Sequence, residues 1–236
     1  MKPDFSRDVL FEGRLTVYQP REGYRFSVEA LLLAEFVRFR RRELAVELGA
    51  GCGVISALLA LRFPGARIVA LEIQELLIQA LGLTVRENGL SDRVFPVKGD
   101  VRRIPLRSGI FSAVVANPPF KPPESGRLPP DESHLLARTE TLATLSDFLR
   151  VARYLLKTGG RFFLVHTAHR AVEVLCGLRE FGLEPKRLRW VYPRPGDEAR
   201  FLLVEAIKGA APEVRVDPPF FIHPDSRPGP EPVSRP

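Results

Sequence analysis

The chain has little of what marks secreted, metal-binding or membrane proteins. It holds two cysteines, Cys52 and Cys176, which lie far apart, so we expect neither a disulfide framework nor a zinc cluster. No apolar run reaches the roughly 18 residues that a membrane-spanning helix needs. The start, Met1-Lys2-Pro3-Asp4, lacks the charged-then-apolar pattern of a secretory signal. We therefore expect a cytoplasmic protein that does not enter a membrane and uses no metal.

What the chain does have is an excess of basic charge. Its 35 Lys and Arg residues outnumber its 28 Asp and Glu residues, which gives a formal net charge of +7 at pH 7. Such an excess favours a polyanionic partner, for example nucleic acid. The length of 236 residues suits one large α/β domain with a small appendage.

From residue 44 onward, short apolar runs alternate with amphipathic segments. This alternation predicts an α/β fold with a mostly parallel sheet and helices on both of its faces. The last two apolar runs are separated only by a Pro-Arg-Pro-Gly turn, so the final strand must be antiparallel. The seven predicted strands cover residues 44–48, 67–71, 94–97, 110–116, 161–165, 188–192 and 201–207.

The two ends of the chain differ from this core. Residues 14–26 are predicted to form a hairpin, and Ser27 is expected to cap a helix that runs from Val28 to about residue 39. Residues 121–137 contain four prolines and must form a long loop. We therefore divide the chain into an N-terminal hairpin and helix (1–42), a core domain (43–208) and a proline-rich tail (209–236).

The segment Asn117-Pro118-Pro119-Phe120 is the most informative local feature. It follows a predicted strand, and the carboxyl ends of parallel strands are the usual place for a ligand crevice. Asn117 offers a carboxamide oxygen, Pro118 offers a carbonyl oxygen held by rigid rings, and Phe120 offers a flat apolar face. These groups suit a planar substrate with an –NH2 group, such as a nucleobase or a carboxamide. The alternative is a plain Pro-Pro turn.

A second motif, Glu47-Leu48-Gly49-Ala50-Gly51-Cys52-Gly53, joins the first core strand to its helix. Its glycines let the backbone approach a ligand closely, and the helix N-terminus favours an anionic group. Glu72 ends the next strand, where a carboxylate can bind a ribose diol. NAD and S-adenosylmethionine both fit this pattern. The short glycine spacing, the antiparallel final strand and Asn117–Phe120 favour S-adenosylmethionine. Asp100, after the third strand, would then bind the adenine amino group or else cap its own backbone.

Together, the glycine loop and Asn117–Phe120 resemble class I S-adenosylmethionine-dependent N-methyltransferases. More narrowly, the segments 23–34, Ala137-Arg138-Thr139-Glu140 and 192–205 resemble the bacterial tRNA1(Val) adenine-N6 methyltransferase family. This resemblance covers about residues 11–223. It ends after Ile222-His223, where family members commonly continue with a tyrosine-bearing segment and an acid. It implies a Rossmann-like methyltransferase fold with the seven-stranded sheet, the N-terminal hairpin and the helix described above.

The resemblance also implies a set of site residues. The target amine would be bound by Asn117, Pro118, Pro119 and Phe120. The cofactor S-adenosylmethionine would be bound by Tyr24, Arg25, Phe26, Ser27, Glu47, Gly49, Ala50, Gly51, Cys52, Gly53, Glu72, Ile73, Asp100, Val101 and Asn117. No residue is expected to bind a metal.

The implied activity is methylation of the exocyclic amino group of adenine in tRNA or another structured RNA. Guanine N2 of ribosomal RNA and a protein glutamine amide are alternative acceptors, because all of these reactions use the same four-residue motif. Functions of another class are an NAD-dependent oxidoreductase and a catalytically silent RNA-binding module. Each of these alternatives predicts a different response to S-adenosylmethionine, NAD or RNA.

Two further features carry hypotheses. His166 ends a strand next to that of Asn117, so a general-base role is one interpretation, but a surface position is favoured. Four basic residues surround two aromatic ones near the C-terminus and suggest either an RNA-facing patch or a charged edge strand. These residues are Lys186, Arg187, Arg189 and Arg194 around Trp190 and Tyr192.

Overall fold

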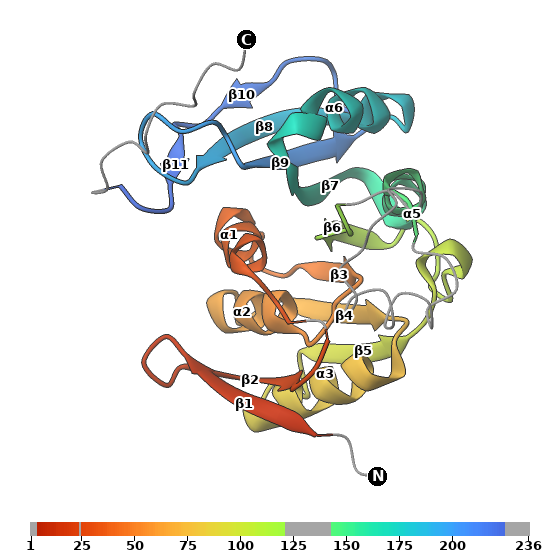
Figure 1. The fold of residues 1–236 in the computed structure, drawn as a ribbon. Helices are drawn as coiled ribbons and strands as arrows, with labels where there is room; N and C mark the ends of the chain where they lie inside the picture. The colour runs from red at the N-terminus through yellow and green to blue at the C-terminus, as the bar shows by residue number, and fades with distance from the viewer. Residues whose placement is uncertain (1–3, 24, 121–142, 225–236) are drawn as a thin grey trace.

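The computed structural model describes residues 4–23, 25–120 and 143–224. Within them, a central sheet lies between two layers of helices (Figure 1). The strands of this sheet are β3 (Leu44–Leu48), β4 (Arg67–Glu72), β5 (Val94–Lys98), β6 (Phe111–Ala116), β7 (Leu156–Thr167), β8 (Leu183–Tyr192), β9 (Phe201–Lys208), β10 (Arg215–Val216) and β11 (Phe220–Phe221). The helices are α1 (Val28–Phe36), α2 (Val54–Arg62), α3 (Glu75–Glu87), α5 (Leu145–Leu155) and α6 (Ala171–Glu180), with single 3-10 turns η1 (Val101–Arg103) and η2 (Ala168–Arg170).

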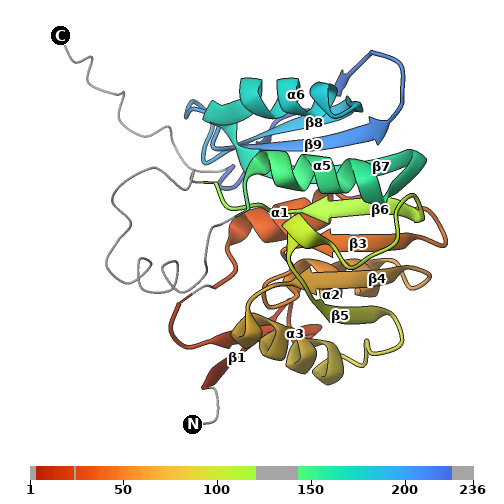
Figure 2. The same cartoon turned by 90° about the vertical axis from the view of Figure 1, so that its right-hand side faces the viewer.

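The sheet has the strand order β10-β8-β9-β7-β6-β3-β4-β5, and β11 also pairs with β8. Figure 2 shows these strands stacked from β8 to β5. The pairs among β3, β4, β5, β6 and β7 are parallel, whereas β9 runs antiparallel to both β7 and β8. The seven predicted strands and the antiparallel final strand are therefore confirmed, and the structure adds the two short strands β10 and β11. The chain leaves β3 toward β4 on one side and returns to β6 on the other, which creates a topological switch point between β3 and β6.

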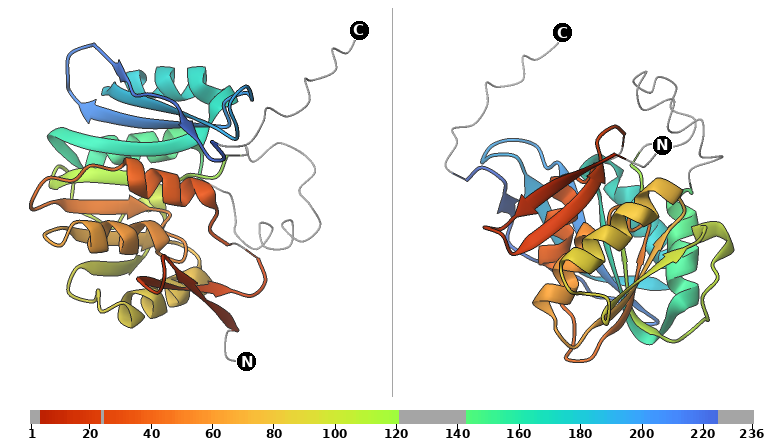
Figure 3. Two further views of the ribbon diagram at one scale, coloured as in Figure 1. Left: turned by 90° about the vertical axis from the view of Figure 1, so that its left-hand side faces the viewer. Right: turned by 90° about the horizontal axis from the view of Figure 1, so that it is seen from below.

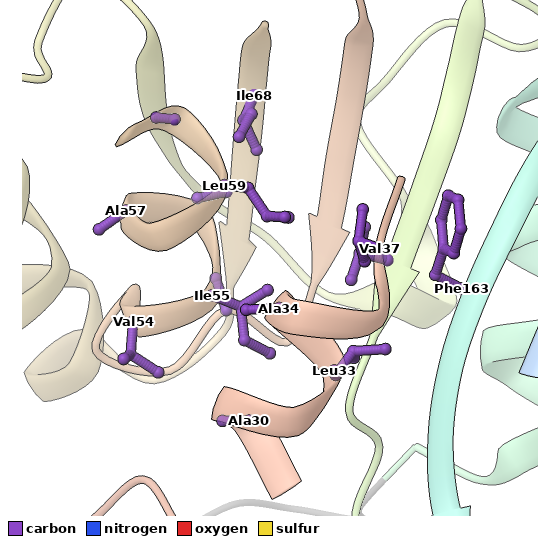
Figure 4. Packing of buried hydrophobic residues seen from close by; sticks show 14 of the residues in the cluster. Ala30, Leu33, Ala34, Val37, Val54, Ile55, Ala57, Leu59, Ile68 and Phe163 are labelled. Carbon is purple, nitrogen blue, oxygen red and sulfur yellow. The ribbon is translucent and has the colours of Figure 1, made fainter. Parts of the chain in front are cut away.

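Two buried apolar clusters hold the helices on the sheet. Helices α1, α2 and α3 pack on one face, and α5 and α6 pack on the other. In Figure 4, Leu33 and Ala34 of α1 lie between Ile55 of α2 and Phe163 of β7. Burying such side chains contributes about 25 cal/mol per Å² of apolar area. Helix α1 is thus part of the core layer, although it precedes the first core strand in the sequence.

Local sequence explains where the helices begin and end. The Thr144 hydroxyl accepts a hydrogen bond from the Asp147 backbone N–H, and the Asp147 carboxylate accepts one from the Thr144 N–H, so α5 begins with a capping box. Helix α3 ends at Asn88-Gly89, where Gly89 has a φ of +63°. Ser27 does occupy the N-cap position of α1, but its side chain makes no capping hydrogen bond. That helix is instead held by its buried, almost wholly apolar sequence.

The N-terminal hairpin exists, but the prediction of its position was wrong. Leu15–Pro20 (β2) pairs with the upstream strand Phe5–Leu10 (β1), not with residues 24–26. The turn uses Phe11 and Glu12 with positive φ angles, followed by Gly13. Because non-glycine residues seldom adopt such angles, this turn has no sequence signature. Figure 3 shows the hairpin beside α3.

Side chains of α3 and of its C-cap residue fix the hairpin through its backbone. The Thr16 N–H donates to the Asn88 carboxamide oxygen at 2.9 Å, and the Tyr18 N–H donates to the Thr84 hydroxyl at 3.0 Å. Both donors belong to β2, whose other edge pairs with β1. The hairpin is therefore attached to the core across 66 or more residues of sequence.

The described part of the predicted tail, residues 209–224, completes the sheet. Strands β10 and β11 pair in parallel with β8, and the buried Asp217 between them contacts three arginines. Arg187, Arg189 and Arg215 place nitrogen atoms at 3.0, 3.3 and 3.4 Å from the Asp217 carboxylate. These arginines hold the pKa of Asp217 below its usual range in spite of the opposing effect of burial.

This arrangement removes Arg187 from the predicted RNA-facing basic patch, whose other basic residues remain a prediction. Arg187 is buried, pairs with Glu205 and Asp217, and stacks 3.7 Å from the ring centroid of Phe36. Its positive charge is balanced inside the protein by two carboxylates, and an aromatic ring packs against the guanidinium. Strand β8 is also not an edge strand, since β10 and β11 cover it. Arg187 therefore contributes to folding and not to an RNA surface.

Candidate cofactor and acceptor site

The register of the parallel strands brings the predicted site residues to one edge of the sheet. Leu48 pairs with Leu71 on one side and with Ala116 on the other. Glu72 in turn pairs with Lys98, two residues before Asp100. The glycine loop, Glu72, Asp100 and Asn117 thus all begin at the carboxyl ends of neighbouring strands. This is the ligand-binding edge of an open α/β sheet, at its switch point.

The glycine loop has a backbone that other residues adopt only with strain. Gly49, Gly51 and Gly53 have φ angles of +70°, +55° and +84°. A Cβ atom on Gly53 would lie 2.1 Å from Cδ1 of Leu81, which is fully buried. The Ala50 N–H donates to the Leu71 carbonyl at 2.8 Å, so the loop is also tied to β4. The loop is therefore preformed for close approach by a ligand.

Glu72 fastens this loop to the end of β4. Its carboxylate is buried and accepts hydrogen bonds from the backbone N–H groups of Gly51 at 2.8 Å, Ile73 at 2.9 Å and Gln74 at 2.8 Å. Burial raises the pKa of Glu72, although these three donors oppose the rise. A carboxylate offers about four acceptor positions, so one is left for a ligand hydroxyl.

Glu47 is more deeply buried and has a different partner. One of its oxygens accepts from the Ser56 backbone N–H at 2.9 Å and from the Ser56 hydroxyl, which ties β3 to the first turn of α2. Burial raises the pKa of Glu47 to about 8. A cationic group bound beside it would favour the ionised carboxylate. Sequence reasoning missed Ser56, whose only signal is its position in the first turn after the glycine loop.

The next two strand ends offer a contact surface for a planar base. Ile73, directly after β4, is 44% exposed. Val101 is buried beside the core, and Asp100 caps the η1 turn by accepting from the Arg102 N–H at 2.8 Å. The Arg102 side chain also contacts Asp100 at 2.7 Å and lowers the pKa of that carboxyl group. Asp100 therefore caps the η1 turn as an ionised carboxylate, and this cap is compatible with the predicted contact to an adenine amino group, which stays a prediction.

The segment before α1 is attached to the hairpin. Arg25 donates to the Ser6 hydroxyl at 2.9 Å and to the Asp8 carboxylate at 2.6 Å, and the Phe26 N–H donates to the Gln19 side chain at 2.9 Å. Tyr24 lies outside the described residues, as does the Ala137–Glu140 run.

Cys52, in the middle of the glycine loop, is not a reactive thiol. Burial raises the pKa of Cys52 to about 12, although the nearby charge of Arg25 acts in the opposite direction. The thiol is neutral at physiological pH and behaves as a small apolar group.

On the other side of the switch point, Asn117 and Phe120 are half-buried and Pro118 is buried. The Phe120 ring lies 5.1 Å from the His166 ring and 6.0 Å from the Phe201 ring, measured between centroids. The Phe120 carbonyl accepts a hydrogen bond from Arg170 at 2.9 Å. Sequence reasoning missed Arg170, since the two residues are 50 positions apart and form no motif.

The favoured surface position of His166 was wrong. His166 is fully buried, because its strand lies between β6 and β9, where it pairs with Leu202. Burial lowers the pKa of His166 to about 4. Its Nδ1 accepts from the Thr167 N–H at 2.9 Å, so the neutral ring carries its hydrogen on Nε2. Such a ring is a weak base.

The described residues offer neither a membrane-spanning helix nor a cluster of metal ligands. None of the helices there is long and apolar enough to cross a membrane. Those same residues contain no group of three or more His, Cys, Asp or Glu side chains that could hold a metal ion.

Comparisons with known proteins agree with this geometry. The chain is similar to a tRNA1(Val) (adenine(37)-N6)-methyltransferase of Porphyromonas gingivalis, with 30% identity over 164 residues. That match covers 68% of this chain and 64% of the relative, so the chain spans slightly under two thirds of that protein's length. A Bacteroides thetaiotaomicron protein of the same name is 27% identical over 192 residues, which is 81% of this chain and 80% of that protein.

The fold is likewise shared. The crystal structure of a predicted O-methyltransferase from Agrobacterium tumefaciens superposes with a TM-score of 0.66 at 23% identity, over 84% of this chain and 89% of that chain. The expected Rossmann-like methyltransferase fold is thereby confirmed. Finally, residues 27–182 match the family model described as the methyltransferase small domain. The chain therefore belongs to the methyltransferase small domain family.

Proposed function

We propose that this protein transfers a methyl group from S-adenosylmethionine to the exocyclic amino group of adenine in tRNA or another structured RNA. One observation carries the proposal. The pairing of Leu48 with Ala116 makes the glycine loop and the Asn117–Phe120 segment direct neighbours at the switch point. A methyl donor on the first motif and a planar amine on the second would then meet without any rearrangement of the sheet.

The proposed donor site consists of the glycine-loop side of the crevice. Bound S-adenosylmethionine supplies an electrophilic methyl carbon on a sulfonium ion. We assign its ribose to Glu72, since that carboxylate has an acceptor position left, and its adenine to the exposed face of Ile73 with Asp100 and Val101. Glu47 and residues 49–53 would hold the methionine part. Arg25, Phe26 and Ser27, with Tyr24, would cover it.

The proposed acceptor site explains why this motif suits an aromatic amine. The lone pair of such an amine is delocalised into its ring, so the amine is a poor nucleophile. Hydrogen bonds from the –NH2 group to the Asn117 carboxamide oxygen and the Pro118 carbonyl would orient it and localise the lone pair toward the methyl group. Catalysis then requires mainly alignment and proximity.

No strong base is needed in this scheme. The methylated ammonium is very acidic and loses its proton to water, which agrees with the low pKa of His166. A base within folded RNA must first leave its stack, and Phe120 offers a face on which it could rest. The net charge of +7 favours an RNA substrate.

The names of the two relatives support adenine in tRNA over the other acceptors. A tRNA substrate is in keeping with a cytoplasmic location. We also retain the division into an N-terminal hairpin and helix (1–42), a methyltransferase domain (43–208) and a C-terminal segment (209–236) as part of the proposal.

The test is the transfer of labelled methyl groups from S-adenosylmethionine to separate tRNA, ribosomal RNA and protein fractions, followed by nucleoside analysis. We expect N6-methyladenosine in the tRNA fraction. Label on guanine N2 in ribosomal RNA, or on protein glutamine, would keep the chemistry and replace the acceptor. Thermal stabilisation by NAD and not by S-adenosylmethionine would indicate an oxidoreductase. RNA binding without any transfer would indicate a silent RNA-binding module.

A further inference from the structure

The segment Asn117–Phe120, called the acceptor segment below, begins where the strand pairing of β6 ends. The pairing of β6 with β3 and with β7 ends at Ala116. Neither Pro118 nor Pro119 has an N–H group to donate to a neighbouring strand. Nevertheless, the alignment proposed above demands that Asn117 and Phe120 stay in place. Another anchor is therefore required beyond the end of the strand.

Arg170 meets this requirement through the backbone of Phe120. Its Nη1 donates to the Phe120 carbonyl at 2.9 Å, its Nε donates to Glu173 at 2.7 Å, and its Nη2 also contacts Glu173. The planar guanidinium is thus held on one side by a carboxylate and directed on the other side at the carbonyl. Only 20% of the Arg170 side chain is exposed.

The Phe120 ring packs against two further aromatic rings, one of which lies close to Arg170 in the sequence. The buried His166 ring and the Phe201 ring both lie within 6.0 Å of it. His166 lies near the end of β7, and Arg170 is the last residue of the η2 turn that links β7 to α6. The short stretch from residue 166 to residue 170 therefore contacts Phe120 twice, through its ring and through its carbonyl.

We propose that Arg170, oriented by Glu173, is a positioning residue that fixes the acceptor segment through the Phe120 carbonyl. This inference rests on the proposed function, because it assigns Arg170 a role in aligning the target amine. A rival interpretation is that Arg170 binds an RNA phosphate. The low exposure of the side chain and the engagement of Nε, Nη1 and Nη2 favour the positioning role.

The first experiment compares steady-state kinetics with tRNA for Arg170→Met and Arg170→Lys. A displacement of about 1 Å in reacting groups can cost about 100-fold in rate, so we expect Arg170→Met to lower kcat by about 10- to 100-fold. The KM for tRNA and the Kd for S-adenosylmethionine should stay within about twofold. Arg170→Lys should recover part of kcat, since a lysine restores a donor but not the fork.

Arg179→Met provides the matched control. Arg179 lies on α6, the helix that follows Arg170, is 64% exposed and pairs with Glu184 outside the acceptor site. We expect its kinetics to match those of the parent protein. A kcat for Arg170→Met within twofold of the parent would overturn the inference. A raised KM with a weaker salt dependence and unchanged kcat would also overturn it, in favour of a phosphate contact.

A second measurement tests whether Arg170 restrains the acceptor segment, and it does not depend on methyl transfer. Phe120→Trp in a Trp190→Phe background places a single indole at the acceptor segment, because the chain has one tryptophan. We expect its fluorescence anisotropy to decay slowly with the whole protein, and Arg170→Met to add a fast local component. Absence of that component would refute the anchor. If the parent protein transferred no methyl group but the fast component appeared, the proposed function would fail and the anchor would stand.

Discussion

The two sides of the switch point are built in different ways. On the side of β3, β4 and β5, the site is made of positive-φ glycines and buried carboxylates that bind backbone N–H groups of the adjacent turns. On the side of β6 and β7, the acceptor segment is held by side chains from a turn about 50 residues later. The first side is a product of local chain geometry, and the second is a product of tertiary contacts.

This difference indicates how each side would respond to mutation. A change in the glycine loop alters the fold and the proposed cofactor site together, because the same atoms serve both. A change in the acceptor segment leaves the sheet intact, since strand pairing ends before it. The predictions that follow test this separation, from the largest expected effect to the smallest.

Asn117→Ala should lower turnover by about 1,000-fold, because it removes one of the two acceptors that orient the amine. The Kd for S-adenosylmethionine, measured by calorimetry, should stay within about twofold. Ser112→Ala is the control, since Ser112 lies near the start of β6, the strand that Asn117 follows, and bonds to Leu44. Full turnover in Asn117→Ala would reduce the motif to a turn.

Gly53→Ala should lower the free energy of unfolding by about 3 kcal/mol and weaken the binding of S-adenosylmethionine. The new Cβ would combine an unfavourable positive φ with the contact to Leu81. Gly109→Ala measures the cost of the positive φ without the packing contact, since Gly109 has a φ of +68° and no atom within 4 Å of the new Cβ. That control should cost about 1 kcal/mol. Equal losses in urea unfolding would show that the packing against Leu81 is unimportant.

The buried Glu47 should make stability depend on pH. Because its pKa rises from 4.5 to about 8 on folding, the native state holds a proton that the unfolded state has released. The free energy of unfolding should therefore fall as pH rises from about 4.5 to 8, by up to about 1.4 kcal/mol per pH unit. Over the same range, the affinity for the cationic S-adenosylmethionine should rise.

Glu47→Gln is the matched variant for this effect, since it keeps the shape and removes the ionisation. Its stability, followed by urea unfolding at several pH values, should show a flatter profile in this window. Its affinity for S-adenosylmethionine should vary less with pH. A slope unchanged from that of the parent would assign the effect to another group, with the buried Glu72 as the first candidate.

His166→Phe, which keeps an aromatic ring beside Phe120 and removes the ionisable group, should have the smallest effect on chemistry. A neutral histidine with a pKa of about 4 is not poised to accept a proton near pH 7, so turnover should stay within about threefold. The parent pH–rate profile should show no inflection near pH 6.5. A loss beyond 100-fold, with the fold retained by circular dichroism, would instead support a direct role in proton transfer.

The sequence was sufficient for the core because its signals are local. Apolar runs of about five residues located all seven core strands, and the glycine loop and Asn117–Phe120 are contiguous motifs. The strand order then placed them together, which is a general property of parallel sheets with this connectivity. Contiguous motifs at strand ends are thus the part of a site that a sequence can reveal.

The predictions that were wrong concern features that depend on segments far apart in the sequence. The turn of the hairpin uses Phe11 and Glu12 in conformations that their residue types do not announce, while Arg21-Glu22-Gly23 resembled a better turn. The burial of His166 depends on a strand on either side of β7. The partner of Arg187 at Asp217 is 30 residues away. Each of these outcomes is decided by distant segments, which periodicity and spacing do not describe.

The pairing of β10 and β11 with β8 has a practical consequence for anyone shortening this protein. Removal of everything after residue 208 would take β10 and β11 from one edge of β8. The N–H and C=O groups along that edge would then be a template for a second chain. The same removal would also deprive the buried guanidinium of Arg187 of one of its two counter-ions. Proteins trimmed at that point should associate or precipitate, whereas those retaining the chain through residue 224 should not.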